Sequence, residues 1–252
     1  MTIRLSTGLR DKLVSSTGFA ACFAGGVIDI YSGTQPATAD SAVTGTLLGR
    51  VSIASTTYVA ETPASATITV AGTAGTIATL NIGSFNIIPL GAVTFDTDAT
   101  TTATALKDAI NRNGIYTATS SGAVVTVIAP AGTGAAHNGL ALAATVTGGT
   151  TATSSGNITG GVAATAGLQF AAPSAGTISK SGIWSFNGLA VGTAGWFRIK
   201  ASVADADGSS TTAVRLDGSV AVSGADMNLS NISITIGAPN TIDTFLYTQP
   251  AQ

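Results

Sequence analysis

Leucines recur at every fourth position near the start of the chain. Leu5, Leu9 and Leu13 stand four residues apart in RLSTGLRDKLV, which is the spacing that lines one face of a helix. Ser6 or Thr7 stands where an N-cap is needed. The pattern predicts a short amphipathic helix, which either covers the chain's own sheet or serves as an arm that docks on a partner.

Alternating apolar and polar positions replace this spacing after the Gly25-Gly26 pair. VIDIY, residues 27–31, has the alternation of a strand, and Gln35-Pro36 ends it because proline cannot donate a ladder hydrogen bond. TGTLLGRVSIAS, residues 44–55, predicts a second strand. Two strands are too few to close a core alone, so this part of the chain needs strands from elsewhere.

The pattern of apolar and polar residues changes from about Ala60. The short strand patterns TITVAG, TIATLNIG and FNIIPLGAVTF come before a helical pattern in ATALKDAINRNG. In that helix Ala103, Leu106 and Ile110 form an apolar stripe, and Asn113-Gly114 supplies a left-handed stop.

The segments on either side of this helix support the same interpretation. Asp96 and Asp98 in FDTD fit a helix-entry cap with favourable dipole placement. YTATSSGAVVTVIAP predicts a hairpin that turns at Ser121-Gly122. The resulting strand–strand–helix–strand–strand order is typical of a small α+β module.

Strand patterns return after residues 148–167, a Gly/Thr/Ser-rich stretch that predicts an exit linker. Turn residues then recur roughly every 8–12 positions, as in a β-sandwich or jelly roll. The strand-like segments are IWSFNG, GWFRIKASV, TAVRLDGSVAV, MNLSNISITIG and TIDTFLYTQP. We expect the main core here, around Trp184, Phe186, Trp196 and Phe197.

The two ends of the chain share a short motif. IYSGTQPA, residues 30–37, and LYTQPA, residues 246–251, each stop an apolar run with Gln-Pro. We interpret them as strand ends in one sheet system, with a chance echo in a Thr/Ala-rich chain as the alternative. The sequence therefore predicts a mainly β protein. Its discontinuous antiparallel β-sandwich or jelly-roll-like domain, residues 1–58 and 167–252, is interrupted by a small inserted α+β domain at 59–166.

Charge is scarce along the chain. Ten Lys and Arg stand against 12 Asp and Glu, so no electrostatic footprint for nucleic acid exists and we expect no direct nucleic-acid contact. MTIRLSTGLRDKL lacks a signal-peptide core, and no run approaches the roughly 18 apolar residues of a membrane span. We therefore expect no membrane association and no export. Cys22, the only cysteine, is expected to be a small buried hydrophobe.

Residues suited to catalysis are few. His137 is the only histidine and Glu61 the only glutamate. A Ser-His-Asp site would need His137, which lies in the loop GTGAAHNGLAL without a G-x-S-x-G elbow. Asp205 and Asp207 in ADADGSS resemble an acidic calcium loop, but the bidentate acid of that pattern is missing, so a polar turn is favoured. We expect no catalytic, metal-binding or cofactor-binding residue, and no cofactor.

Both ends of the chain resemble a group of structural proteins of tailed bacteriophages. The segments concerned are IDIYSGTQPATADSAVTGTLLGRVS near the start, and GWFRIKASVADADG and AVRLDGSVAVSGADMNLSNISITIG near the end. They cover the proposed β-domain, roughly half the chain. The resemblance implies a virion protein that is made in the cytoplasm of a bacterial host.

The insertion resembles a different module, a small α+β domain found in contractile-phage tail-sheath proteins and other virion proteins. The helix of that module is matched by Thr104 to Asn111, and its hairpin and loop by Val124 to Asn138. The rest of a sheath protein is not matched. The resemblance thus implies a decorating or interface module and not a contractile subunit.

These features together predict a non-enzymatic structural protein of a tailed-bacteriophage virion. Our first hypothesis is a decoration or cement protein on the outer capsid surface, in contact with the major capsid protein or other virion proteins. We expect a homo-oligomer, with a trimer as the first guess. The alternatives are a tail or head–tail connector protein and a receptor-binding module on a fibre. An enzyme that depends on His137 comes last.

Overall fold

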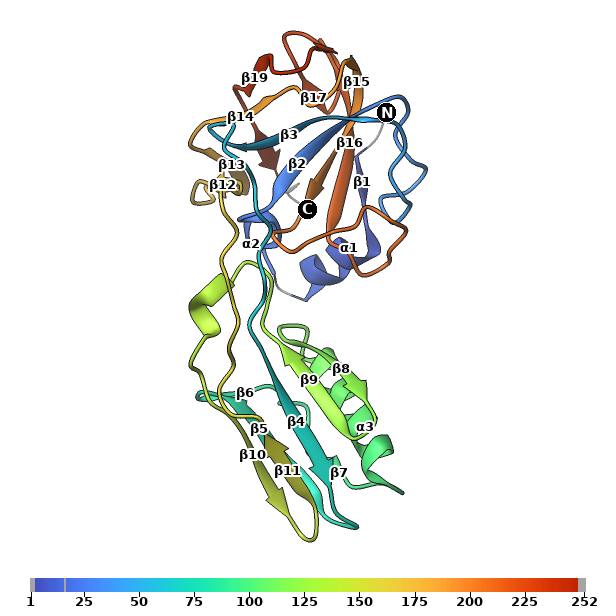
Figure 1. Ribbon diagram of the computed structural model, residues 1–252, viewed down its shortest axis with the longest axis vertical. Coiled ribbons are helices and arrows are strands. Elements are labelled where there is room, and N and C mark those ends of the chain that lie inside the picture. The colour runs from blue at the N-terminus through green and yellow to red at the C-terminus, as the bar shows by residue number, and fades with distance from the viewer. Residues whose placement is uncertain (1–2, 16, 249–252) are drawn as a thin grey trace. The chain divides into compact units, whose positions relative to one another are not determined.

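The computed structural model describes residues 3–15 and 17–248. The protein is mainly β, and among these residues every ladder between strands is antiparallel except that of β16 and β17. The chain forms two compact units, as Figure 1 shows. Unit 1 comprises Met1–Glu61 and Ala164–Gln252, and unit 2 comprises Thr62–Ala163. The predicted borders of the insertion, 59 and 166, differ from those of unit 2 by three residues at each end.

Strands from both ends of the chain build one nine-stranded sheet in unit 1. Its main path runs β1-β16-β15-β2-β3-β14-β19, so the N-terminal strands β2 and β3 lie between C-terminal strands (Figure 1). These strands are β1 (Arg4–Leu5), β2 (Val27–Ser32), β3 (Leu47–Ile53), β14 (Trp184–Asn187), β15 (Gly192–Lys200), β16 (Arg215–Ala221), β17 (Met227–Asn228), β18 (Ser233–Ile234) and β19 (Pro239–Ile242). The short strands β17 and β18 pair with β16 and β15.

A second, three-stranded sheet holds the end of the chain. It consists of β12 (Gln169–Phe170), β13 (Thr177–Ser181) and β20 (Leu246–Thr248). The strands that lead into the two TQPA motifs both belong to unit 1, but they lie in different sheets, because β2 is in the nine-stranded sheet and β20 in this one. The last residues of the second motif, 249–251, lie outside the described residues. The strand β2 also ends before the first motif, where Gly33 adopts a φ of 77°.

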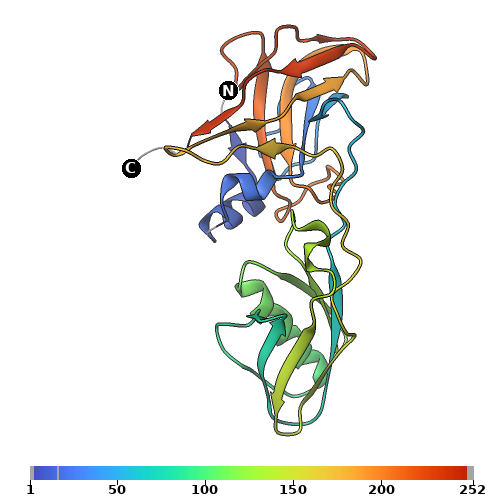
Figure 2. The same ribbon diagram turned by 90° about the vertical axis from the view of Figure 1, so that its left-hand side faces the viewer.

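Two short helices precede β2. The predicted N-terminal helix is confirmed as α1 (Thr7–Val14), and the Ser6 hydroxyl accepts a hydrogen bond from the Leu9 amide at 3.1 Å. Leu9 is fully buried and Leu13 packs against the same core. The pattern did not predict the second helix, α2 (Phe19–Phe23), which carries the buried Cys22. Figure 2 shows both helices beside the strands of unit 1.

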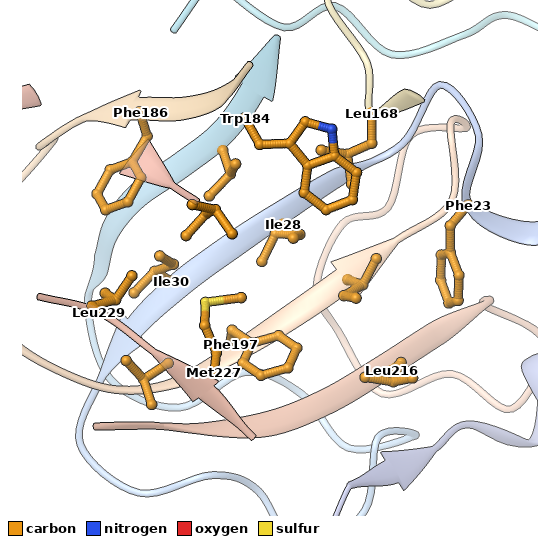
Figure 3. Close-up of a cluster of buried hydrophobic side chains, with 14 of the residues drawn as sticks. Phe23, Ile28, Ile30, Leu168, Trp184, Phe186, Phe197, Leu216, Met227 and Leu229 are labelled. Carbon is orange, nitrogen blue, oxygen red and sulfur yellow. The ribbon is translucent and has the colours of Figure 1, made fainter. Parts of the chain in front are cut away.

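The core of unit 1 lies between β2, β15 and β16 on one side and β14 with its neighbours on the other. In Figure 3, Trp184 and Phe186 point from β14 toward Ile28 and Ile30 of β2. The prediction of a core around Trp184, Phe186 and Phe197 is confirmed. Trp196 is also fully buried, but it lies outside this core cluster and stacks on Tyr31 with ring centroids 4.5 Å apart. Successive strand residues point to opposite faces, so Trp196 and Phe197 cannot share one core.

Unit 2 has its own hydrophobic core, built from two four-stranded sheets and one long helix. One sheet has the order β11-β4-β9-β8, and the other has β10-β5-β6 with β7 also on β5. The strands are β4 (Ser65–Ala71), β5 (Thr76–Ile82), β6 (Phe85–Asn86), β7 (Val93–Thr94), β8 (Thr117–Ser121), β9 (Val124–Ile128), β10 (Leu142–Thr147) and β11 (Thr151–Ser154). A short 3-10 helix, η1, spans Gly134–His137.

The predicted helix of unit 2 is confirmed as α3 (Ala99–Arg112). Asp98 is its N-cap, and its carboxylate accepts a hydrogen bond from the Thr101 amide at 2.8 Å. The stripe of Ala103, Leu106 and Ile110 is fully buried, and Gly114 takes the left-handed conformation after the helix. The hairpin of β8 and β9, which turns at Gly122, is also confirmed.

The prediction of an exit linker over residues 148–167 is wrong for its first part, whereas residues 155–167 form no regular strand. The first part forms β11, which pairs with β4 and continues the ladder of β10 with β5 beyond a corner. At this corner Gly72 and Gly148 have φ values of 120° and 69°, and backbone of the facing strand leaves no room for a side chain. The segment looked weakly patterned because alternate residues of this edge strand are exposed, and threonine and serine suit such positions.

Candidate functional site

One face of the nine-stranded sheet carries charged side chains inside otherwise apolar strands. Asp29 lies in β2, Arg198 and Lys200 in β15, and Arg215 and Asp217 in β16. All five residues are at least nine-tenths buried. Alternation along β15 places Arg198 and Lys200 on the face opposite Phe197 and Ile199, which belong to the hydrophobic core. This face therefore holds a buried layer of charge.

The strand register arranges most of these charges in a single row. Arg4 of β1 is paired with Asp217, Asp217 with Arg198, Arg198 with Asp29, and Asp29 with Arg50 of β3. The sign of the charge alternates at every step across five neighbouring strands. Opposite charges that face each other on adjacent strands stabilise a sheet, whereas like charges would destabilise it. We call this row the charge ladder.

Short hydrogen bonds join the members of the charge ladder. Arg50 donates from Nε and Nη2 to the two carboxylate oxygens of Asp29, at 2.7 and 2.8 Å. Arg198 binds both oxygens of Asp217 in the same bidentate way, each at 2.8 Å. Lys200 Nζ lies 2.7 Å from Oδ2 of Asp29. Bidentate arginine–carboxylate pairs are among the strongest hydrogen bonds in proteins, and buried charges require such pairing.

Burial and pairing act on the pKa values of these groups in opposite directions. Burial raises the pKa of Asp217, and the bonds from Arg198 only partly offset it. The hydrogen bond to Asp29 raises the pKa of Arg50, although burial opposes this change. Burial, together with the nearby charge of Asp29, raises the pKa of Tyr31. For Asp217, burial thus favours the neutral carboxyl, whereas the pairing with Arg198 favours the charged form.

The arginines also hold a loop over this face. We call residues 33–46 the covering loop; it contains the first TQPA motif. Its carbonyl groups accept hydrogen bonds from three strands: Pro36 from Arg4, Ala39 from Arg215 at 3.5 Å and Ser41 from Arg198 at 3.1 Å.

The start of α1 adds a further attachment for the covering loop. The carboxylate of Asp40 accepts hydrogen bonds from the amide and hydroxyl of Thr7, at 2.8 and 2.7 Å. Three strands and one helix thus fix a loop that has no regular structure of its own.

A second loop completes the cover. Residues 201–214, which we call the strap, connect β15 to β16. Asp205 binds the guanidinium of Arg215 through both carboxylate oxygens, and Asp207 binds Lys200 Nζ at 2.8 Å. The strap also bonds to the covering loop, since the Val43 amide donates to the carbonyl of Asp207 at 3.0 Å.

The two aspartates that resembled a calcium loop are thus engaged with cations of the sheet. Burial alone would raise the pKa of Asp205, but bonds from Arg215 and from the Asp207 amide outweigh it, so this pKa is lowered. In the part of the chain that the structure describes, no group of three or more His, Cys, Asp and Glu side chains is placed to hold a metal ion.

The other residues considered from the sequence lie at separate places. His137 ends η1 in unit 2, with its ring edge-on to Tyr116 at 5.6 Å. Cys22 is buried in unit 1, and burial raises its pKa to about 11. Glu61 is buried in unit 1 and accepts a hydrogen bond from the hydroxyl of Ser202.

Sequence reasoning missed the charge ladder, although its signal was present. VIDIY places one charged residue within an apolar strand pattern, and GWFRIK and AVRLDGS each place two on alternate positions. Such charges are far too costly to bury unless a partner of opposite sign faces them. The numbers of acidic and basic residues in these three strands nearly balance, and this balance could have indicated pairing. The register that makes the pairs required the structure.

The ladder brings together the two sequence motifs on which the resemblance to phage proteins rests. Tyr31 of IYSGTQPA stacks on Trp196 of GWFRI, and Arg198 of that second motif binds the loop that follows the first. Asp226 of SGAD accepts hydrogen bonds from the amide and hydroxyl of Ser219 at 2.8 and 2.7 Å. The motif residues therefore contact one another and shape the fold of unit 1.

No family model matches this sequence, and no curated protein matches it either. Over the ranges 3–15 and 17–248, the longest apolar helical segments fall short of what a membrane crossing requires.

Proposed function

We propose that this protein is a non-enzymatic structural protein of a tailed-bacteriophage virion. More specifically, it is a decoration or cement protein that binds the outer surface of the capsid, in contact with the major capsid protein. It acts as a homo-oligomer, with three copies as the first arrangement to test. The resemblance of both chain ends to phage structural proteins directs the proposal, and the distribution of charge supports it.

The distribution of charged residues along the chain is the main support for this proposal. The chain has only ten basic and 12 acidic residues, and eight of these 22 form the ion pairs on the covered face of the sheet. Unit 2 has five charged residues in total, all within positions 96–112. Much of the surface is therefore formed by threonine, serine, alanine and glycine.

Such a surface suits permanent contact with neighbouring subunits. Burying an unpaired ion at an interface costs roughly several kcal/mol. Small uncharged side chains avoid this cost. The cores of interfaces are depleted of charged residues for the same reason. The covering loop supports the same proposal, because a loop that is already fixed loses little conformational entropy when it is bound.

A tail or head–tail connector protein is the second candidate. It uses the same uncharged surfaces, and only its position and copy number in the particle differ. A receptor-binding module on a fibre is less well supported. Tyr31 and Tyr116 are buried, whereas a glycan-binding platform needs exposed aromatic rings.

Electron microscopy of immunogold-labelled particles tests this proposal. Antibodies against unit 2 should label the whole capsid surface of the phage that encodes the chain. Labelling confined to the tail or to one vertex would favour the connector candidate. Purified particles that contain none of the chain, by antibody and by mass spectrometry, would overturn the virion assignment.

A further inference from the structure

The strap is attached to the sheet differently from the covering loop. Within residues 201–214 the chain forms no helix or strand, and two side chains of the strap make ion pairs with the sheet. Asp205 pairs with Arg215 at the start of β16, and Asp207 pairs with Lys200 at the end of β15. Both tethers are carboxylates on the loop that bind cations on the sheet.

We propose that the strap is a releasable cover, which opens as a unit and leaves the sheet folded when Asp205 and Asp207 lose their ion pairs. This inference concerns the free protein and does not depend on its place in a virion. It goes beyond a description of the ion pairs because it assigns the two loops different roles. The covering loop is held by arginines of the sheet. The middle of the strap is held by its own two carboxylates, whereas its ends are also fixed by hydrogen bonds from the Tyr58 hydroxyl to the Ser202 carbonyl and from the Ser6 hydroxyl to the Ala213 carbonyl.

The middle of the strap makes few contacts with other elements. It curves around a hollow of about 400 Å³, and every residue that lines this hollow belongs to the strap or is Arg215. Asp207 also has a φ of 61°, a left-handed conformation that is strained for a residue other than glycine. Segments with few apolar contacts and stored strain open at a lower free energy than the core elements around them.

The charge ladder explains why the sheet survives this opening. The bidentate pairs of Arg50 with Asp29 and of Arg198 with Asp217 use no strap residue. When the strap opens, Lys200 keeps its contact with Asp29 at 2.7 Å. The covering loop loses two backbone bonds, from Val43 to Asp207 and from Ser210 to Asp40, but it keeps the bonds from Arg4 and Arg198.

The charged groups around the two tethers come from four elements. Asp205 faces Arg215 of β16 and Lys200 of β15, and it also accepts a hydrogen bond from the amide of Asp207. Asp207 faces the same two cations and lies within electrostatic reach of Arg50 on β3 and Tyr31 on β2. Protonation of Asp205 removes its attraction to both cations at once. Because the pKa of Asp205 is lowered, its contribution is present above the ordinary pKa of 3.8 and is lost as the pH falls below it.

Limited proteolysis of the variant Asp205→Asn/Asp207→Asn at neutral pH tests the proposal. The strap contains several small aliphatic residues that elastase cleaves after, and cleavage follows the population of the open form. We expect cleavage within 201–214 to be faster by at least about tenfold, because a hydrogen bond to a charged group contributes that much to an equilibrium. Asp243→Asn, which removes an exposed carboxylate elsewhere in unit 1, is the matched control and should cleave like the wild type.

Two outcomes would overturn the proposal. One is unchanged cleavage of the double variant. The other is cleavage at equal rates in the strap and in β15, with loss of the fluorescence signature of the buried Trp184 and Trp196, since that pattern shows global unfolding. Hydrogen exchange of the wild-type protein, measured as the pH falls from about 6 to about 3 and corrected for intrinsic rates, gives an independent answer. Strap peptides should lose protection before peptides of β15 do, and simultaneous loss would contradict the proposal.

Discussion

Arg198 and Asp217 face each other across β15 and β16, and both side chains are fully buried. Their guanidinium and carboxylate groups meet in two hydrogen bonds of 2.8 Å, and the remaining donor of Arg198 Nη2 reaches the carbonyl of Ser41. The pair thus links two C-terminal strands to a loop near the N-terminus. It is one of the buried ion pairs on the covered face of the nine-stranded sheet.

Removing one member of this pair should be far more damaging than removing both. Asp217→Ala leaves the guanidinium of Arg198 buried without its carboxylate, and we expect a loss of about 3–5 kcal/mol in the free energy of unfolding. Arg198→Met/Asp217→Leu removes both charges and should cost much less. Urea denaturation of the three proteins measures the difference. An equal loss in the single and the double variant would show that packing, and not charge pairing, is what matters here.

Two glycines of the covering loop form a matched pair. Gly33 and Gly45 have φ values of 77° and 79°, but a Cβ at Gly45 would lie 2.0 Å from the carbonyl oxygen of Ser32, whereas a Cβ at Gly33 meets nothing within 4 Å. Gly33→Ala should cost roughly 1–2 kcal/mol from backbone strain alone. Gly45→Ala should cost clearly more, because the Ser32 carbonyl must also move. Thermal unfolding followed by circular dichroism tests the order, and a Gly33→Ala variant that is the less stable of the two would contradict the geometry.

Asp205 and Asp217 should shape the acid stability of the protein in opposite senses. The pKa of Asp205 is lowered in the folded state, so its contribution to stability is present above pH of about 4 and is lost as the pH falls. The pKa of Asp217 is raised by burial, so its contribution instead improves as the pH falls through that raised value. Asp205→Asn should therefore flatten the loss of stability in acid, and Asp217→Asn should steepen it. Urea midpoints of both variants, measured across the acid range, test this. A steeper loss for Asp205→Asn than for Asp217→Asn would contradict these pKa directions.

Cys22 should be unreactive in the folded protein. Burial raises the pKa of Cys22 from its ordinary value of 9.0 to about 11, so very little thiolate exists at pH of about 8. The contribution of this thiol to stability is complete below pH 9 and is lost as the pH rises toward 11, because the unfolded chain ionises first. A thiol reagent such as dithionitrobenzoate should label the protein only at the rate of unfolding. Rapid labelling of the native protein, as fast as in urea, would contradict the buried position.

The two units should unfold separately, because each has its own hydrophobic core. Leu106 is fully buried in α3 of unit 2, so Leu106→Ala should destabilise that unit by about 2–5 kcal/mol. Both tryptophans, Trp184 and Trp196, lie in unit 1, so tryptophan fluorescence reports on that unit alone. Its midpoint should stay unchanged in the variant, while circular dichroism shows an earlier transition. A matching shift of the fluorescence midpoint would mean that the units unfold as one.

Local sequence signals predicted the elements that depend on local physics. The helices α1 and α3 were predicted from apolar spacing, together with the caps Ser6 and Asp98, since a cap and its helix are neighbours in sequence. The hairpin at Gly122 followed from the same kind of evidence. The discontinuous arrangement was predicted because the N-terminal part offered too few strands to close a core by itself.

Features that depend on strand register could not be predicted from the sequence. Residues 151–154 form a strand because β4 offers a free edge, which no pattern within TATS reveals. Trp196 was assigned to the hydrophobic core because it is large and apolar, yet alternation along β15 places it on the charged face beside Arg198. The pairing of Asp29 with both Arg50 and Lys200 joins residues from distant parts of the chain, and only the fold shows it.

The proposed role on the capsid is tested most directly by the copy number of this chain in purified virions. Quantitative mass spectrometry can compare the amount of this chain with the amount of the major capsid protein. The account predicts a ratio of one to one, or of one to a small integer. A ratio of one to several tens would contradict the decoration role and place the protein in the tail or the connector.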